Sequence, residues 1–264
     1  MKKIFALALT LLAVTSICLS AAPKRKNVVD TGSFSLNTST LKIYRPGTAA
    51  PVALALRPAS INAKDFSWVD ANIKPPYTAE TNGDRTTVTA KGNGKCYDTV
   101  MKYVVVKGSP AMLVDMKYTA NKDFHSQRGS APSIDLPVEL TKLTLPERDP
   151  IALVKGGKQT TFQLRTWALF SQEDPEKDAI MVIIPSLDDY DFSSGGRITC
   201  GAYTRGHGWR PGMDISHPDF QLTDFAVGDE TSARVIFVFT NGKADCAKLF
   251  QEALKTFQAE LEAE

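Results

Sequence analysis

The chain has 264 residues, of which 43% are hydrophobic and 23% are charged, and its formal net charge is +2. This length allows one large hydrophobic core or two small ones. Nucleic-acid binding needs a basic surface, and electrostatic docking to an anionic membrane needs a cluster of basic residues, so the near-neutral charge excludes both. After residue 22 no apolar run approaches the roughly 20 residues that a membrane span needs.

The first 20 residues have the pattern of a secretory signal peptide. Lys2 and Lys3 precede an apolar run over residues 4–12, and small residues follow at 20–22. Charge, apolar run and small residues in this order predict cleavage near residues 20–22 and export to the periplasm or the extracellular space. Removing Lys2 and Lys3 leaves a mature chain with no net charge.

Short alternating segments separated by turn residues make up the body of the chain, residues 27–242, which we expect to form one β-sandwich domain. The clearest part is residues 77–118. Asn82-Gly83 is a strong hairpin signal, and further turns are expected at 92–94 and 107–110. These positions predict an antiparallel meander of four strands.

The polar stretch from Asp123 to Pro132 is loop-like and could divide the strands into two sheets or into two halves of one sandwich. After it, residues 134–140 alternate again. Ala179 to Ile184 is continuously apolar, which is typical of a buried central strand. Strands are also expected within 162–170, 220–227 and 234–239.

Residues 243–264 consist of helix formers and predict a C-terminal helix. One face of a 3.6-residue period carries its large apolar side chains, Leu249, Phe250, Ala253, Leu254, Phe257 and Leu261. The expected fold class is therefore mostly β: a large antiparallel two-sheet sandwich with a C-terminal amphipathic helix.

The segment from Tyr77 to Tyr118 resembles the galactose-mutarotase-like supersandwich. It combines a Gly-marked hairpin, the strand Tyr-Asp-Thr-Val-Met-Lys-Tyr-Val-Val-Val, a Gly-Ser-Pro turn and the strand Leu-Val-Asp-Met-Lys-Tyr-Thr. This family includes sugar epimerases and the β domains of many glycosidases and lyases, in which a helical linker often follows the sandwich. The resemblance implies a carbohydrate-associated role, and it assigns no catalytic residue, because no histidine here stands in a motif that can be matched position by position.

The candidate ligand site is the glycine-rich stretch 193–220, which we expect to be a long loop. Loops on rigid scaffolds commonly carry function. The stretch gathers aromatic rings that could stack on a sugar and charged groups that could bind its hydroxyls. The candidate binding residues are Tyr203, Arg205, His207, Trp209, Arg210, Asp214 and His217. The alternative is a loop anchored by a buried Trp209, with its charges solvated.

No metal and no other cofactor is expected. The chain has no Cys-x-x-Cys motif and no Cys/His cluster, and the acidic run 188–191 lacks the spacing of a calcium loop. Bulky Ile17 precedes Cys18, which argues against a bacterial lipoprotein signal. Disulfide pairing stays open among the cysteines of the mature chain, Cys96, Cys200 and Cys246.

Three functions remain open, and the catalytic residues and the oligomeric state are not predicted. The first is an exported carbohydrate-binding or carbohydrate-processing accessory domain, with the 193–220 stretch as its site. The second is a mutarotase-like or lyase-like sugar enzyme that uses a histidine and a carboxylate as acid and base. The third is a non-enzymatic cell-envelope interaction protein that docks through the C-terminal helix. An enzyme is the less favoured interpretation, because the sequence has no Gly-x-Ser-x-Gly motif and no phosphate-binding loop.

Overall fold

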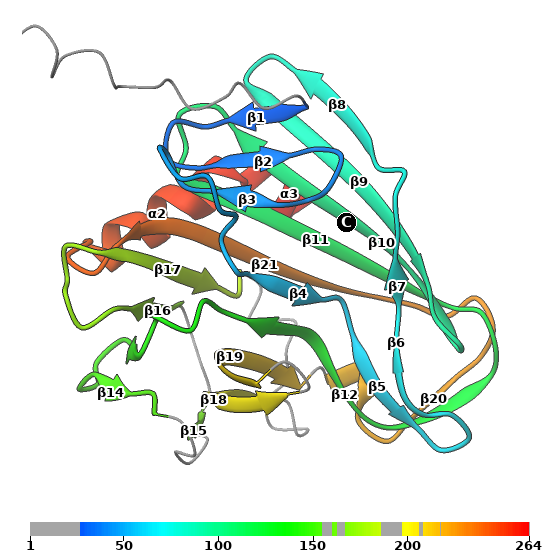
Figure 1. The fold of residues 1–264 in the computed structure, drawn as a ribbon. Helices are drawn as coiled ribbons and strands as arrows, with labels where there is room; N and C mark the ends of the chain where they lie inside the picture. The colour runs from blue at the N-terminus through cyan, green and yellow to red at the C-terminus, as the bar shows by residue number, and fades with distance from the viewer. Residues whose placement is uncertain are drawn as a thin grey trace, which may run out of the picture.

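The computed structural model describes residues 27–154, 160–162, 167–185, 197–205, 208–216 and 218–263; at 67–68, 160–162, 197–205, 208–209, 216 and 218 it describes the backbone alone. Within these residues the protein is mostly β, with antiparallel pairing throughout (Figure 1). None of the described helices is long and apolar enough to cross a membrane.

The large sheet has ten described strands in the order β14-β13-β16-β17-β21-β11-β10-β9-β7, with β8 also paired to β9. Their bounds are β7 (Asn72–Ile73), β8 (Thr78–Asn82), β9 (Arg85–Asn93), β10 (Tyr97–Val106), β11 (Ala111–Ala120), β13 (Lys142–Thr144), β14 (Ile151–Ala152), β16 (Trp167–Ser171), β17 (Asp178–Ile183) and β21 (Glu230–Asn241). The predicted four-stranded meander is confirmed as β8 to β11. Gly83, with φ 60°, supplies the backbone conformation that its first turn requires.

The second sheet has eight described strands in the order β15-β18-β19-β12-β5-β6, and β4 and β20 also pair with β12. Their bounds are β4 (Ala55–Arg57), β5 (Ser60–Ala63), β6 (Ser67–Asp70), β12 (Phe124–Asp135), β15 (Thr160–Phe162), β18 (Arg197–Arg205), β19 (Gly208–Ser216) and β20 (Thr223–Phe225). A one-turn 3-10 helix, η2 (Pro218–Phe220), precedes β20. A small third sheet contains β1 (Val28–Asp30), β2 (Ser35–Asn37) and β3 (Ile43–Tyr44).

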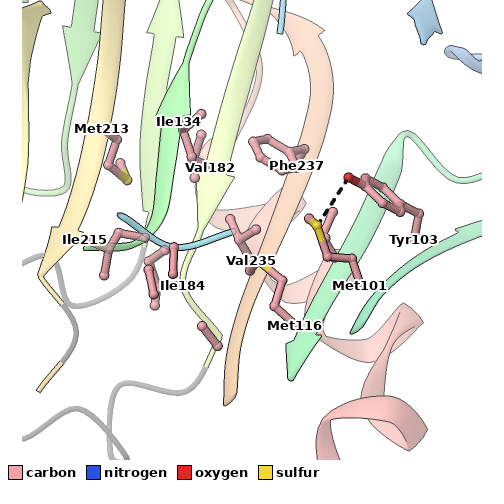
Figure 2. Close-up of a cluster of buried hydrophobic side chains, with 14 of the residues drawn as sticks. Met101, Tyr103, Met116, Ile134, Val182, Ile184, Met213, Ile215, Val235 and Phe237 are labelled. Carbon is pink, nitrogen blue, oxygen red and sulfur yellow. Dashed lines mark hydrogen bonds between the residues drawn. The ribbon is translucent and has the colours of Figure 1, made fainter. Parts of the chain in front are cut away.

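The main core lies between the large sheet and the second sheet. Figure 2 shows Ile134, Met213 and Ile215 of the second sheet facing side chains of the large sheet that include Val182 and Phe237. The third sheet contributes Phe34, Leu36 and Ile43 to the same core. The fold is therefore sandwich-like, and the expected fold class is confirmed.

A second core covers the opposite face of the large sheet, where α2 (Cys246–Thr256) and α3 (Gln258–Glu262) pack. Phe257 and Ala253 contact this core, together with Leu113, Met181 and Ile236. This explains the continuous apolar run at 179–184. Alternate residues of β17 face the two cores, so both faces of the strand are buried.

Two predicted loops are strands in the structure. The stretch 123–132 lies largely in β12, so the predicted loop is wrong. It does not divide the strands by sheet, because β4 to β6 before it belong to the second sheet and β16, β17 and β21 after it belong to the large sheet. Most of the stretch 193–220 lies in β18 and β19, which form an antiparallel hairpin rather than a long loop. Both segments look polar because only one of their faces lies against the core.

Candidate functional site

The outward face of the second sheet carries a cluster of polar side chains. On β12 and β19, Ile134, Met213 and Ile215 enter the core. Because neighbouring residues of a strand alternate between its two faces, Ser133, Asp135 and Asp214 lie on the face away from that core. Arg57 on β4 pairs in register with Ser133, and Ser133 pairs with Asp214 on β19. We call these four residues, Arg57, Ser133, Asp135 and Asp214, the polar cluster.

Charge-assisted contacts hold the polar cluster together. Arg57 Nη2 donates a hydrogen bond to Asp135 Oδ2 at 2.8 Å. Ser133 Oγ donates to Asp214 Oδ1. Ser133 is 1% exposed and the side chain of Asp135 is 11% exposed, whereas that of Arg57 is 33% exposed. Hydrogen bonds to ionised groups are stronger when they are shielded from water, so these side chains have fixed positions.

The β18–β19 register extends this face toward the predicted site residues. Tyr203 pairs with Arg210 and Thr199 pairs with Asp214, so positions 203, 210 and 214 lie on one face of the hairpin. Position 205, two residues from 203, lies on that face as well. The structure therefore brings four of the predicted site positions, those of Tyr203, Arg205, Arg210 and Asp214, to the face that carries the polar cluster.

Position 209 belongs to the other face of the hairpin. Trp209 pairs in register with Thr204, and its position has the same parity as Met213 and Ile215, which are buried in the main core. His207 and His217 lie outside the described residues. The seven predicted residues are thus not gathered on a single face.

Sequence reasoning missed three members of the polar cluster. Arg57, Ser133 and Asp135 are distant in sequence from 193–220, and only strand pairing brings them to Asp214. A weak signal exists in β12, because Ser133 and Asp135 alternate with Ile134 and Leu136. The segment was expected to be a strand from residue 134 onward, but no sequence pattern indicates its neighbours.

His125 lies far from the polar cluster. Its Nδ1 is 2.8 Å from Asp224 Oδ1 on β20, and the Asp224 side chain is 91% exposed. Ten residues of β12 separate His125 from Asp135, which places them roughly 30 Å apart. The pair is a surface contact at the other end of the sheet.

An acidic groove of about 500 Å³ lies next to this histidine, and its carboxylates include Asp219, Asp224, Asp229 and Glu230. Several of them already have structural partners: Asp229 Oδ2 accepts the Ala226 N–H at 2.7 Å, and Glu230 contacts Lys117, which lowers the pKa of Glu230. Among the described residues no group of three or more histidine, cysteine or acidic side chains is arranged to hold a metal. The acidic run 188–191 lies outside them.

Cys96 and Cys246 are free thiols in the structure, Cys96 fully buried and Cys246 half-buried. Burial raises the pKa of each thiol to about 11, so neither is ionised near neutral pH. The side chain of Cys200 lies outside the described residues. Cys96 and Cys246 are therefore part of the packing and carry no reactive thiolate.

The chain matches no family model and no curated protein. Among solved structures it is similar to an α-mannosidase from Enterococcus faecalis V583, with 8% sequence identity and a TM-score of 0.53, over 87% of this chain and 31% of that one. It is also similar to an α-galactosidase from Lactobacillus brevis, with 12% identity and a TM-score of 0.49, over 70% of this chain and 29% of that one.

A third similarity is to an α-N-acetylgalactosaminidase from Bifidobacterium bifidum, with 10% identity and a TM-score of 0.46, over 89% of this chain and 38% of that one. The chain spans about a third of the length of these solved proteins. At 8% identity, the likeness to the α-mannosidase shows a shared fold alone. In fold, the described chain is a sandwich of the kind found within a much longer α-mannosidase.

Proposed function

We propose that this protein is an exported carbohydrate-binding or carbohydrate-processing accessory domain, and that its ligand surface is the outward face of the second sheet. The observation that carries the proposal is the polar cluster. Two carboxylates, a guanidinium and a hydroxyl are held on one face by Arg57–Asp135 and Ser133–Asp214 contacts. Sugar hydroxyls are bound by such fixed, partly dehydrated polar groups.

The fold likeness supports the same proposal by analogy. The solved protein with the highest quoted TM-score is named as an α-mannosidase, and the match covers 87% of this chain. Because one fold can host many functions, the likeness makes glycans the first ligands to test and assigns no reaction. The resemblance to the galactose-mutarotase-like supersandwich stays a prediction, and it assigns no reaction either.

Calorimetric titration of manno- and galacto-oligosaccharides, neutral and acidic, tests the proposal. Wild type should bind at least one of them, and Asp214→Asn should weaken that binding about tenfold, because a charge-assisted hydrogen bond is replaced by a neutral one. Asp224→Asn is the matched control, since it removes an exposed carboxylate on β20, beside the far end of β12. No binding by wild type to any glycan, or equal losses in both variants, would contradict the proposal.

Trp209→Ala distinguishes a ligand surface on the outward face of the second sheet from a ligand site centred on Trp209. Position 209 has the parity of the buried residues of β19, so this variant should lower the melting temperature and leave glycan affinity nearly unchanged. Loss of binding with an unchanged melting temperature would move the ligand to the other face of the hairpin.

Two further parts of the proposal have their own tests. Product analysis during the titration distinguishes an accessory domain from an enzyme, because only an enzyme converts the glycan.

Export is proposed from the pattern of residues 1–20, and the intact mass of the protein recovered from the secreting host checks it. The mass should correspond to a chain that begins at Ala21 or Pro23, and a chain that still begins at Met1 would contradict export by cleavage.

A further inference from the structure

A cleft of about 540 Å³ lies between α2 and the turn that joins β10 to β11. The apolar part of its lining consists of Val106, Ala111, Val238, Leu249 and Ala253. All five belong to the second core or pack against it, so the cleft lies on the face of the large sheet that the C-terminal helices cover. Its volume falls within the roughly 300 to 1,000 Å³ that is typical of small-molecule sites.

Small side chains leave this space open. Ala111 on β11 and Ala253 on α2 are both buried and both line the cleft, where longer side chains from the sheet and the helix would fill the space. Val106 and Leu249 also line it and are only half-buried, so part of their apolar surface remains open to a ligand. Covering apolar surface is favourable, and a concave apolar cleft therefore suits an apolar chain.

Two lysines make the charge of the cleft positive. Lys107 from the turn and Lys255 from α2 both line it, and both are exposed. None of the ion pairs between described residues involves either lysine. The carboxylate that lines the cleft, Glu252, lies 3.8 Å from the ammonium group of Lys248, one helical turn away. Glu252 is thus partly balanced by Lys248, and the two lysines of the cleft favour an anion.

We propose that this cleft binds a free fatty acid, with its apolar chain against Ala111, Leu249 and Ala253 and its carboxylate at Lys107 and Lys255. A lysine ammonium is a compact point charge without the planar fork of arginine, so it suits a single anionic head group. The inference is independent of the proposed glycan function, because the strands that line the cleft, β10, β11 and β21, belong to the large sheet and the polar cluster lies on the second.

The test compares three probes that share one alkyl chain and differ in the charge of the head group: decanoate, decanol and decyltrimethylammonium. Calorimetric titration of each, below the concentration at which it forms micelles, gives the affinities. Wild type should bind decanoate about tenfold more tightly than decanol and decyltrimethylammonium least, and the preference for decanoate should shrink in 1 M salt. Binding of none of the probes would overturn the proposal and leave the glycan function standing.

Charge variants test the head-group site. Lys107→Gln and Lys255→Gln should each weaken decanoate binding about threefold, as expected for exposed charges, and the double variant should bind decanoate no better than decanol. Lys91→Gln is the matched control, because it removes an exposed lysine of β9 that does not line the cleft. A preference for decanoate that persists unchanged in the double variant would overturn the proposal.

A steric variant tests the chain site. Leucine is nearly as good a helix former as alanine, and Ala253→Leu would extend a side chain into the cleft, so the melting temperature should hold while decanoate binding falls at least about tenfold. Undiminished binding by this variant, confirmed as folded, would overturn the proposal. Binding to anionic lipid vesicles, with none to free decanoate, would overturn it in favour of a membrane surface.

Discussion

Arg57 Nη2 lies 2.8 Å from Asp135 Oδ2, and this contact joins β4 to β12 across 78 residues of sequence. The Asp135 side chain is nearly buried, so removing Arg57 would take a counter-charge away from a shielded carboxylate. We expect Arg57→Met to lower the free energy of unfolding by about 2 kcal/mol, below the range for a fully buried pair because Arg57 is one-third exposed. Urea denaturation measures this.

The exposed Lys117–Glu230 ion pair is the matched control. Its side chains are 55% and 50% exposed, so solvent screening leaves this pair with little effect on stability. Lys117→Met should therefore change the unfolding free energy far less than Arg57→Met. Equal losses of unfolding free energy in the two variants would show that burial of Asp135 does not strengthen its ion pair with Arg57.

The C-terminal helices belong to the fold of the described chain. Phe257, at the junction of α2 and α3, is 0% exposed in the second core, and Arg234 Nη1 donates to Leu261 O at 3.0 Å. Phe257→Ala should lower the unfolding free energy by about 3 to 5 kcal/mol, as for other buried aromatic truncations. Lys248→Ala, on the exposed side of α2, should change it by less than about 0.5 kcal/mol.

The stability of the Phe257→Ala variant also tests whether the C-terminal helix can dock to a partner. The apolar face of the helix covers the protein's own large sheet, so the proposed docking element has no free apolar face. If Phe257→Ala left stability unchanged, the helix would be undocked in solution, and the interaction hypothesis would regain its basis.

Strand rhythm predicts the meander β8 to β11 and the buried strand β17, because those segments alternate clearly or are apolar throughout. It fails at β12 and at the β18–β19 hairpin, where glycine, serine and arginine on the outward face hide the alternation of core residues such as Met213 and Ile215. The candidate site was likewise predictable only in part. Arg210 and Asp214 are found by composition, whereas Arg57, Ser133 and Asp135 reach them only through long-range pairing, which one sequence does not reveal.

Gly129 on β12 tests the packing beneath the second sheet. A Cβ at this position would lie 2.7 Å from Phe220 Cβ, closer than side-chain carbons approach. Gly129→Ala should therefore lower the unfolding free energy by about 1 to 3 kcal/mol through overpacking. The neighbouring Ser130→Ala serves as control, and the double variant with Phe220→Gly, which removes the clashing Cβ, should show less than additive loss if the clash is the cause. Additive losses would contradict this explanation.

Alkaline pH should destabilise the protein through Cys96. Burial is the main cause that raises the pKa of this thiol to about 11, while Lys122 opposes the shift, and the unfolded thiol titrates near 9. The folded state thus holds its proton more tightly than the unfolded state, so the contribution to stability is complete below pH 9 and is lost as the pH rises toward 11. One group costs at most about 1.4 kcal/mol per pH unit in this window.

Cys96→Ala isolates this contribution. Its absolute stability will differ because a buried side chain changes, so the comparison is the difference in unfolding free energy between pH 8 and pH 11 for each protein. That difference should be smaller by about 2 kcal/mol in Cys96→Ala than in wild type. The remaining alkaline loss belongs to Cys246, whose pKa is also raised to about 11, and to Tyr97 and Tyr103, whose pKa values burial raises as well. An identical loss in both proteins would mean that the Cys96 thiol ionises as easily in the folded state as in the unfolded chain.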